Sequence, residues 1–128
     1  MAKKTKTNRA RVSRRMKKPP RLRATWWGYR RENGDVGSRN YLLVLSGLFS
    51  ANPVCERVAR TLRHSVSITH PLGRCQIAPD LERTLKTLVG HGLNANAGAV
   101  LIIDHYHENE RSGEEIAHEI ARSGKRVE

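Results

Sequence analysis

The chain has 128 residues, which suits one domain with a modest hydrophobic core. Hydrophobic residues make up 38% of it and aromatic residues only 5%, so the core is expected to be aliphatic. The formal net charge is +12, and no apolar run approaches the roughly 18 residues that a membrane-spanning helix needs, so the sequence offers no membrane span.

The positive charge is concentrated at one end of the chain. Residues 1–25 contain 11 of the 24 Lys and Arg residues and no acid, which leaves 13 bases against 12 acids in residues 26–128. Because residues 1–25 are also poor in aliphatic side chains, they are expected to form a disordered basic arm in front of one folded domain. Such an arm can neutralise phosphates, so a binding module that uses it to engage nucleic acid or a partner protein is the alternative to an enzyme.

The folded part opens with Trp26-Trp27, which is expected to anchor the chain on the domain or to cover an interface. Residues 32–35 read Glu-Asn-Gly-Asp and predict a turn, because Asn-Gly is a strong turn signal. The uninterrupted apolar run at residues 41–45 predicts a strand over residues 41–46. Asn52 and Pro53 predict the start of a helix, with Asn52 as its N-cap and Pro53 in the first helical position.

Two more strand–helix units follow. The second combines a short strand at residues 65–69 with a helix at residues 79–91. The third combines an apolar strand at residues 99–104 with a helix at residues 112–124, which begins with a capping box and ends in glycine. Residues 125–128 look like the lead into a fourth strand that the chain does not contain.

This alternation of strands and helices predicts an α/β fold, in which a parallel sheet of βα units lies between helical layers in a Rossmann-like arrangement. The sequence has no G-x-G-x-x-G motif, no P-loop and no nucleophile elbow. Dinucleotide binding, nucleoside triphosphate binding and esterase activity therefore lose support.

Polar residues follow each predicted strand. Parallel sheets place their sites beyond the carboxyl ends of the strands, so the loops that follow them are expected to converge on one candidate site. The polar residues of these loops are Ser46, Ser50, Asn52, His70, Arg74, Cys75, Gln76, Asp104, His105, His107 and Glu108.

The histidines and carboxylates of this set suit a divalent metal such as Fe(II), Zn(II) or Mn(II), although their spacing matches no known ligand pattern, and solvated loop histidines are the alternative. Arg74 and the helix N-termini suit a substrate carboxylate. The pair Arg39-Asn40 precedes the first strand, so it is expected at the opposite edge, where it would fix a domain contact or a partner subunit.

The chain has two cysteines, and they do not form a metal-binding or redox pair by spacing. Cys55 falls within the first predicted helix and is expected in the core. Cys75, beside Arg74, is either a small half-buried residue or a nucleophile or metal ligand with a lowered pKa. The expected setting is the reducing cytoplasm.

The run Gly28-Tyr29-x-Arg31-x-x-Gly34-x-Val36-Gly37-Ser38-Arg39-Asn40-Tyr41 resembles the opening segment of the altronate/galactarate dehydratase family of hydro-lyases, which also includes sulfolactate sulfo-lyase. The resemblance covers residues 27–128. Its further motifs are Ala51-Asn52-Pro53-Val54, Glu56-Arg57-Val58-Ala59, His70-x-x-Gly73, Asp80-Leu-Glu-Arg-Thr-Leu85, Asn94-x-Asn96 and Gly98-Ala-Val-Leu101.

The sequence departs from the family pattern at three thiol positions. Ser50 stands where the family usually has Cys, and Arg74 stands where it has a second Cys, with Cys75 one place later. The family segment G-L-G-C-E is replaced by residues 104–108, Asp-His-Tyr-His-Glu. A site built from histidine and carboxylate could therefore take the place of a thiol-dependent iron site.

The resemblance implies β-elimination of water from a sugar-acid carboxylate, assisted by a divalent metal, which is iron in the family. By resemblance His70 is the expected catalytic, site-lining residue. The residues expected to contact substrate are Arg74, Asn52 and Ser50, and those expected to hold the metal are Asp104, His107 and Glu108. Family enzymes are several times longer, so the domain is expected to need the remaining domains or another subunit of a lyase.

Overall fold

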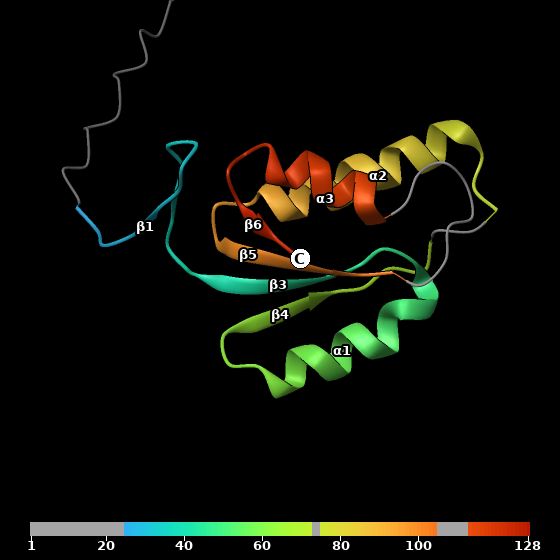
Figure 1. Ribbon diagram of the computed structural model, residues 1–128, viewed down its shortest axis with the longest axis horizontal. Helices are drawn as coiled ribbons and strands as arrows, with labels where there is room; N and C mark the ends of the chain where they lie inside the picture. Colours follow the sequence, from blue (N-terminus) through green and yellow to red (C-terminus); the bar gives the residue numbers. More distant parts are fainter. Residues whose placement is uncertain (1–24, 73–74, 105–112) are drawn as a thin grey trace, which may run out of the picture.

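The computed structural model describes residues 25–72, 75–104 and 113–128 (Figure 1). A sheet of four parallel strands, in the order β4-β3-β5-β6, forms its centre. The strands are β3 (Tyr41–Ser46), β4 (Ser65–Ile68), β5 (Ala97–Ile103) and β6 (Arg126–Val127). The predicted α/β class and the parallel sheet are therefore confirmed.

Helices cover both faces of this sheet (Figure 1). Helix α1 (Asn52–Thr61) packs on one face, against β3 and β4. Helices α2 (Ala78–Leu93) and α3 (Gly113–Ala121) pack on the other face and against each other. Within the described part of the chain, none of the helices combines the length and the hydrophobicity required to cross a membrane.

The alternation of side chains along β3 supplies the two halves of the core. Leu43 and Leu45 belong to the cluster on the side of α2 and α3, where Ile120 is fully buried. Val44, between them, points to the other face and packs with Cys55 of α1. Successive side chains of a strand face opposite ways, so an apolar run without alternation is suited to a sheet covered on both faces.

The prediction that the fourth strand lies beyond the chain is wrong. Arg126 and Val127 pair in parallel with Ala99 and Val100 of β5. The ladder continues through Glu128, whose N–H donates to the carbonyl of Val100 at 3.1 Å. A strand this short carries no periodicity that a sequence pattern could reveal; the open edge of β5 supplies its hydrogen-bond partners.

A small antiparallel hairpin precedes the sheet, with strands β1 (Tyr29–Arg30) and β2 (Val36–Gly37). The turn predicted at residues 32–35 connects them, and Gly34 adopts the positive φ of 90° that glycine accepts without strain. Trp27 is fully exposed, so the expectation that it anchors the chain on the described domain is wrong. The hairpin is held to the domain by other contacts, described below.

The prediction that Asn52 is an N-cap is also wrong. A 3-10 turn, η1 (Phe49–Ala51), runs directly into α1, so the cap position falls on Ala51, which already has helical φ and ψ of −82° and −11°. Asn52 is the first residue of the helix, and its side chain makes contacts with another loop instead. Two predicted features, the basic arm (except Thr25) and the start of the third helix at Ser112, lie outside the described residues.

Candidate functional site

The carboxyl ends of three strands meet at one edge of the sheet, on the right in Figure 1. The register places Ser46 of β3 beside Ile103 of β5, and Leu45 beside Ile68 of β4. The loops that leave these strands carry the predicted site residues. The structure describes Ser50, Asn52, His70 and Asp104, whereas Arg74, His105, His107 and Glu108 lie outside the described residues.

His70 connects two of these loops through both nitrogens of its ring. Nδ1 accepts a hydrogen bond from the backbone N–H of Leu72 at 3.2 Å, and Nε2 lies 2.9 Å from the carbonyl oxygen of Ser46. An acceptor Nδ1 means that Nε2 carries the proton, so the ring is the neutral Nε2–H tautomer, which donates to Ser46. In this arrangement His70 positions the loop backbone.

Asn52 joins the same network from the start of α1. Its Nδ2 donates to the carbonyl of His70 at 2.8 Å, and its Oδ1 accepts from the N–H of His70 at 3.4 Å. The side-chain amide therefore pairs with both backbone groups of one residue and aligns the end of β4 with the start of α1. The structure thus brings Asn52 and His70 together, as the loop convergence predicted.

Two serines of this edge differ in accessibility. Ser46 is fully buried, and its hydroxyl donates to the carbonyl of Leu48 at 2.7 Å. Ser50 is exposed, in the turn just before α1. Cys55 of α1 is fully buried, as predicted. Burial raises the pKa of its thiol, and a hydrogen bond with the Ser46 side chain partly lowers that pKa.

Asp104 lies between the end of β5 and the start of α3. Its Oδ2 accepts a hydrogen bond from the N–H of Gly113 at 2.9 Å, in the first turn of α3, where a negative charge is favourable. Its carboxyl group also lies against Gly47: a Cβ built on that glycine would be 2.9 Å from Cγ of Asp104. Glycine at position 47 lets the loop after β3 and the carboxylate after β5 lie side by side.

No group of three or more His, Cys, Asp and Glu side chains suited to a metal occurs among the described residues. Asp104 is the one predicted metal ligand that the structure describes, and Gly113 already donates to one of its oxygens. The two other predicted ligands, His107 and Glu108, lie outside the described residues. Imidazole and carboxylate donors would suit Fe(II) by their chemistry.

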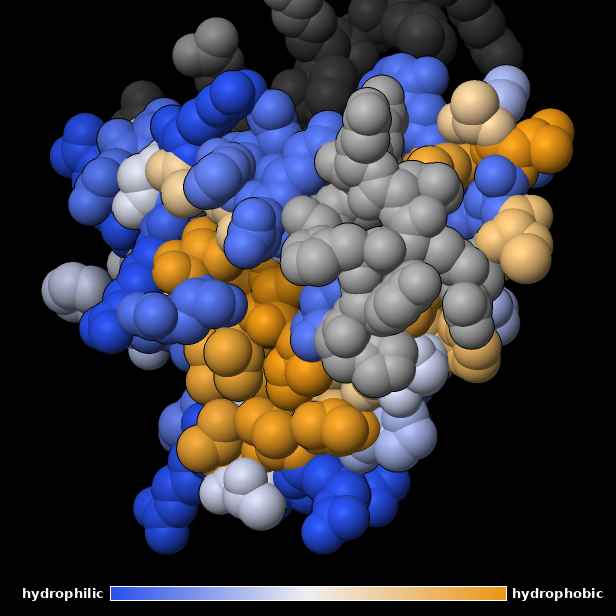
Figure 2. All heavy atoms as spheres, turned by 45° about the vertical axis from the view of Figure 1, so that its right-hand side comes forward, coloured by the Kyte–Doolittle hydropathy of each residue, from blue (hydrophilic) through white to orange (hydrophobic). Residues whose placement is uncertain are grey.

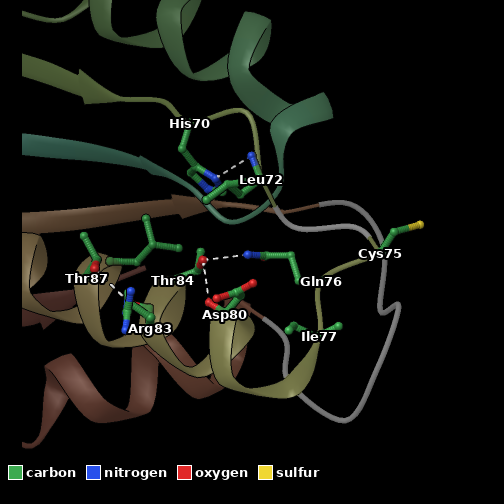
Figure 3. Close-up of a pocket in the computed structure, with 10 residues that line it drawn as sticks. His70, Leu72, Cys75, Gln76, Ile77, Asp80, Arg83, Thr84 and Thr87 are labelled. Atoms are coloured by element: carbon green, nitrogen blue, oxygen red, sulfur yellow. Dashed lines mark hydrogen bonds between the residues drawn. The ribbon is translucent and has the colours of Figure 1, made fainter.

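An open groove of about 620 Å³ runs beside His70, between the loop that follows β4 and the N-terminal half of α2 (Figure 3). One wall consists of His70 and Leu72, and the other of residues on one side of α2. The remaining lining residues are Cys75, Gln76, Ile77, Asp80, Arg83, Thr84, Thr87 and Leu88.

The α2 side of this groove is absent from the residues predicted from sequence. Its polar residues at positions 80, 83, 84 and 87 recur at helical spacing, and this pattern in the sequence could have indicated a polar side of the helix. Of the two alternatives for Cys75, the half-buried one is wrong. Cys75 is exposed, its backbone has a positive φ of 54°, and its thiol points away from the other lining residues (Figure 3).

The Arg39-Asn40 pair lies at the opposite edge of the sheet, as predicted. There the Asn40 Oδ1 accepts from Arg31 at 2.8 Å, and the backbone N–H of Arg39 donates to Asn96 at 3.0 Å. Arg31 also donates to the carbonyl of Ala95 at 2.8 Å and to that of Arg39 at 3.1 Å. Arg31 therefore fastens the β1–β2 hairpin to the loop that precedes β5.

Comparison with known proteins bears out the resemblance seen in the sequence. The profile of a family described as "D-galactarate dehydratase/Altronate hydrolase, second domain" matches residues 28–128. The chain belongs to this family. The match includes both the Arg31 hairpin and the loops around His70.

Two curated proteins are similar in sequence to this chain. The (2R)-sulfolactate sulfo-lyase subunit beta of Chromohalobacter salexigens is 42% identical over 79 residues, which cover 62% of this chain and 20% of the relative. The altronate dehydratase of Bacillus subtilis (strain 168) is 33% identical over 89 residues, which cover 62% of this chain and 18% of the relative. The chain thus spans about a fifth of the length of these relatives. No solved structure matches it.

Proposed function

We propose that this hydro-lyase-type domain takes part in the elimination of water from a hydroxy-carboxylate of the sugar-acid class. The observation that carries the proposal is the network of Ser46, Asn52 and His70 at the carboxyl edge of the sheet, next to an open groove, in a member of a dehydratase family. The substrate class comes from the name of the family and from the altronate dehydratase relative.

In this proposal His70 lines the site and holds the loops that surround the substrate. Its neutral ring keeps the carbonyl of Ser46 and the N–H of Leu72 in place, and Asn52 holds the backbone of His70. Asn52, Ser50 and Arg74 are proposed to face the substrate.

Asp104, together with His107 and Glu108, is proposed to hold a divalent metal such as Fe(II). When bound there, the metal would supply Lewis-acid polarisation of the leaving hydroxyl group. The chain's own contribution is to orient the hydroxy acid. Asp104 would hold the metal while its Oδ2 accepts the hydrogen bond from the N–H of Gly113 in the first turn of α3.

We also propose that the remaining part of a lyase covers the carboxyl edge. Large apolar side chains are exposed there: Phe49 is 43% exposed, Leu72 42% and Ile77 67%. Figure 2, which brings this end of the molecule forward, shows hydrophobic side chains gathered on the surface. The relative from Chromohalobacter is itself a subunit, which supports a partner polypeptide.

Native purification of the tagged chain from its own source, followed by mass spectrometry, tests this proposal. A dehydratase-like polypeptide is expected to co-purify, and the assembled complex is expected to dehydrate D-galactarate or altronate, whereas the chain alone is expected to be inactive. Ile77→Ser should reduce co-purification, and Val66→Ser, at a 39% exposed residue of β4, serves as the matched control.

Efficient turnover by the isolated chain would contradict the need for a partner. Recovery of nuclease-sensitive nucleic acid alone, lost when residues 1–25 are deleted, would favour the binding module instead of the lyase.

A further inference from the structure

We propose that the groove beside His70 binds the carboxylate of a polyhydroxy acid, with Arg83 of α2 as the cation that receives it (Figure 3). This inference rests on the proposed function and gives its substrate a binding site. It assigns a recognition role to a residue that lies outside the loops after the strands.

The groove has the size and composition of a small-molecule site. Its volume of about 620 Å³ falls in the usual range for such sites, roughly 300–1,000 Å³. Leu72 and Leu88 supply apolar surface from opposite walls, and Arg83 and Asp80 supply opposite charges. Apolar surface with a few polar groups suits a sugar acid, whose C–H groups and oxygens alternate along the molecule.

Arg83 has no acidic partner among the residues that the structure describes. The other Lys or Arg of α2, Lys86, pairs with Glu82 at 2.7 Å. A similar i,i+3 arrangement pairs Arg122, just after α3, with Glu119 of α3 at 2.6 Å. Arg83 therefore keeps its guanidinium available, and a guanidinium can form two parallel hydrogen bonds with one carboxylate.

The neighbouring groups are suited to hydroxyl groups. The Thr87 hydroxyl donates its proton to the carbonyl of Arg83 at 2.8 Å, so its oxygen lone pairs face outward as acceptors. Thr84 donates to the carbonyl of Asp80 at 3.0 Å and accepts from Gln76 at 2.9 Å. Asp80 lies one turn before Arg83, and its carboxylate can accept hydrogen bonds from the hydroxyl groups of the acid.

The groove lies next to the residues proposed to surround the substrate during the elimination of water. His70 lines the groove and also belongs to the network with Asn52 and Ser46. A carboxylate held by Arg83 would thus place the rest of the acid along the wall formed by the loop after β4. Arg83 is a substrate-positioning residue in this proposal, and it takes no part in proton transfer.

Isotope-labelled NMR and calorimetry on the full chain test the proposal with three matched compounds. D-Galactarate carries carboxylates and hydroxyls, galactitol has the same carbon chain without carboxylates, and adipate has the carboxylates without hydroxyls. Galactarate is expected to bind most tightly and to shift the amide signals of Thr84 and Thr87. Arg83→Gln should weaken its binding by about tenfold or more, the loss of about 1.4 kcal/mol that one charged hydrogen bond can account for.

Arg57→Gln is the matched control, because Arg57 is an exposed arginine on α1, on the other face of the sheet. It is expected to leave galactarate binding unchanged. The proposal is overturned if galactarate does not bind, if galactitol binds equally well, if both arginine variants behave alike, or if the signal shifts fall outside α2 and the loop after β4.

These results are independent of the co-purification test. If the lyase complex assembles and Arg83→Gln leaves its KM for galactarate unchanged, this inference falls and the proposed function stands. If galactarate binds through Arg83 but neither the chain alone nor any complex that contains it dehydrates a sugar acid, the proposed function is refuted and the binding site is retained.

Discussion

Replacement of His70 by alanine tests whether the ring holds the site together. The substitution removes the donor to the carbonyl of Ser46 and the acceptor of the Leu72 N–H. Each hydrogen bond contributes about 1 kcal/mol, and a buried carbonyl that loses its partner costs a further 1–2 kcal/mol, roughly. Ser46 is fully buried, so the free energy of unfolding should fall by about 3 kcal/mol.

Urea denaturation followed by circular dichroism measures this loss. His70→Asn should lose about 2 kcal/mol, because its Oδ1 can still accept the N–H of Leu72 while the bond to Ser46 is gone. His91→Ala, at an exposed histidine of α2, is the matched control and should change the free energy of unfolding by less than about 0.5 kcal/mol. A loss below about 1 kcal/mol for His70→Ala, or an Nδ1–H tautomer in the NMR spectrum of the ring, would refute this account.

Three further predictions follow from other parts of the structure. Arg31→Met should lower the free energy of unfolding by about 2 kcal/mol, because it removes three hydrogen bonds, and Arg31→Lys should lower it less. A thiol reagent at pH 8 should label Cys75 at once, whereas Cys55, whose pKa is raised by burial, should react only after unfolding. Ile120→Ala should destabilise the domain by about 3 kcal/mol, because the side chain is fully buried between the sheet and the helices.

Each of these predictions has an outcome that contradicts it. Equal stabilities for Arg31→Met and the unmodified chain would mean that the hairpin is not fastened by the guanidinium. Two thiols reacting at the same rate under native conditions would contradict the burial of Cys55. A loss below about 1 kcal/mol for Ile120→Ala, measured by the same urea titration, would contradict the dense packing of this cluster.

The linkage between pH and stability gives the Cys55 assignment a second test. Its pKa in the folded chain lies above the ordinary value of 9.0, so the unfolded chain ionises first as the pH rises. The contribution of the neutral thiol to stability is therefore complete below pH 9.0 and declines above it. In the variant Cys55→Ala this part of the decline should disappear.

The candidate site was predictable only in part. Asn52 and His70 lie in or beside loops that follow neighbouring parallel strands. Because the carboxyl ends of parallel strands lie at the same edge of a sheet, the sequence alone could place these two residues near each other. The use of both His70 nitrogens by backbone groups could not be predicted, because it depends on how two loops far apart in the sequence are aligned. The α2 side of the groove could not be predicted from that rule, because the rule places the loops that follow parallel strands and says nothing about the exposed side of a helix.

The sequence by itself determined the α/β class, the apolar strands, the buried Cys55 and the family. Each of these depends on local composition, on the spacing of apolar residues or on motifs that are contiguous in the chain. Only the tertiary structure decided that β6 joins the sheet, that Arg31 fastens the hairpin through Asn40 and Ala95, and that Arg83 lies in the same groove as His70. These are contacts between distant segments, and their geometry depends on how the helices pack on the sheet.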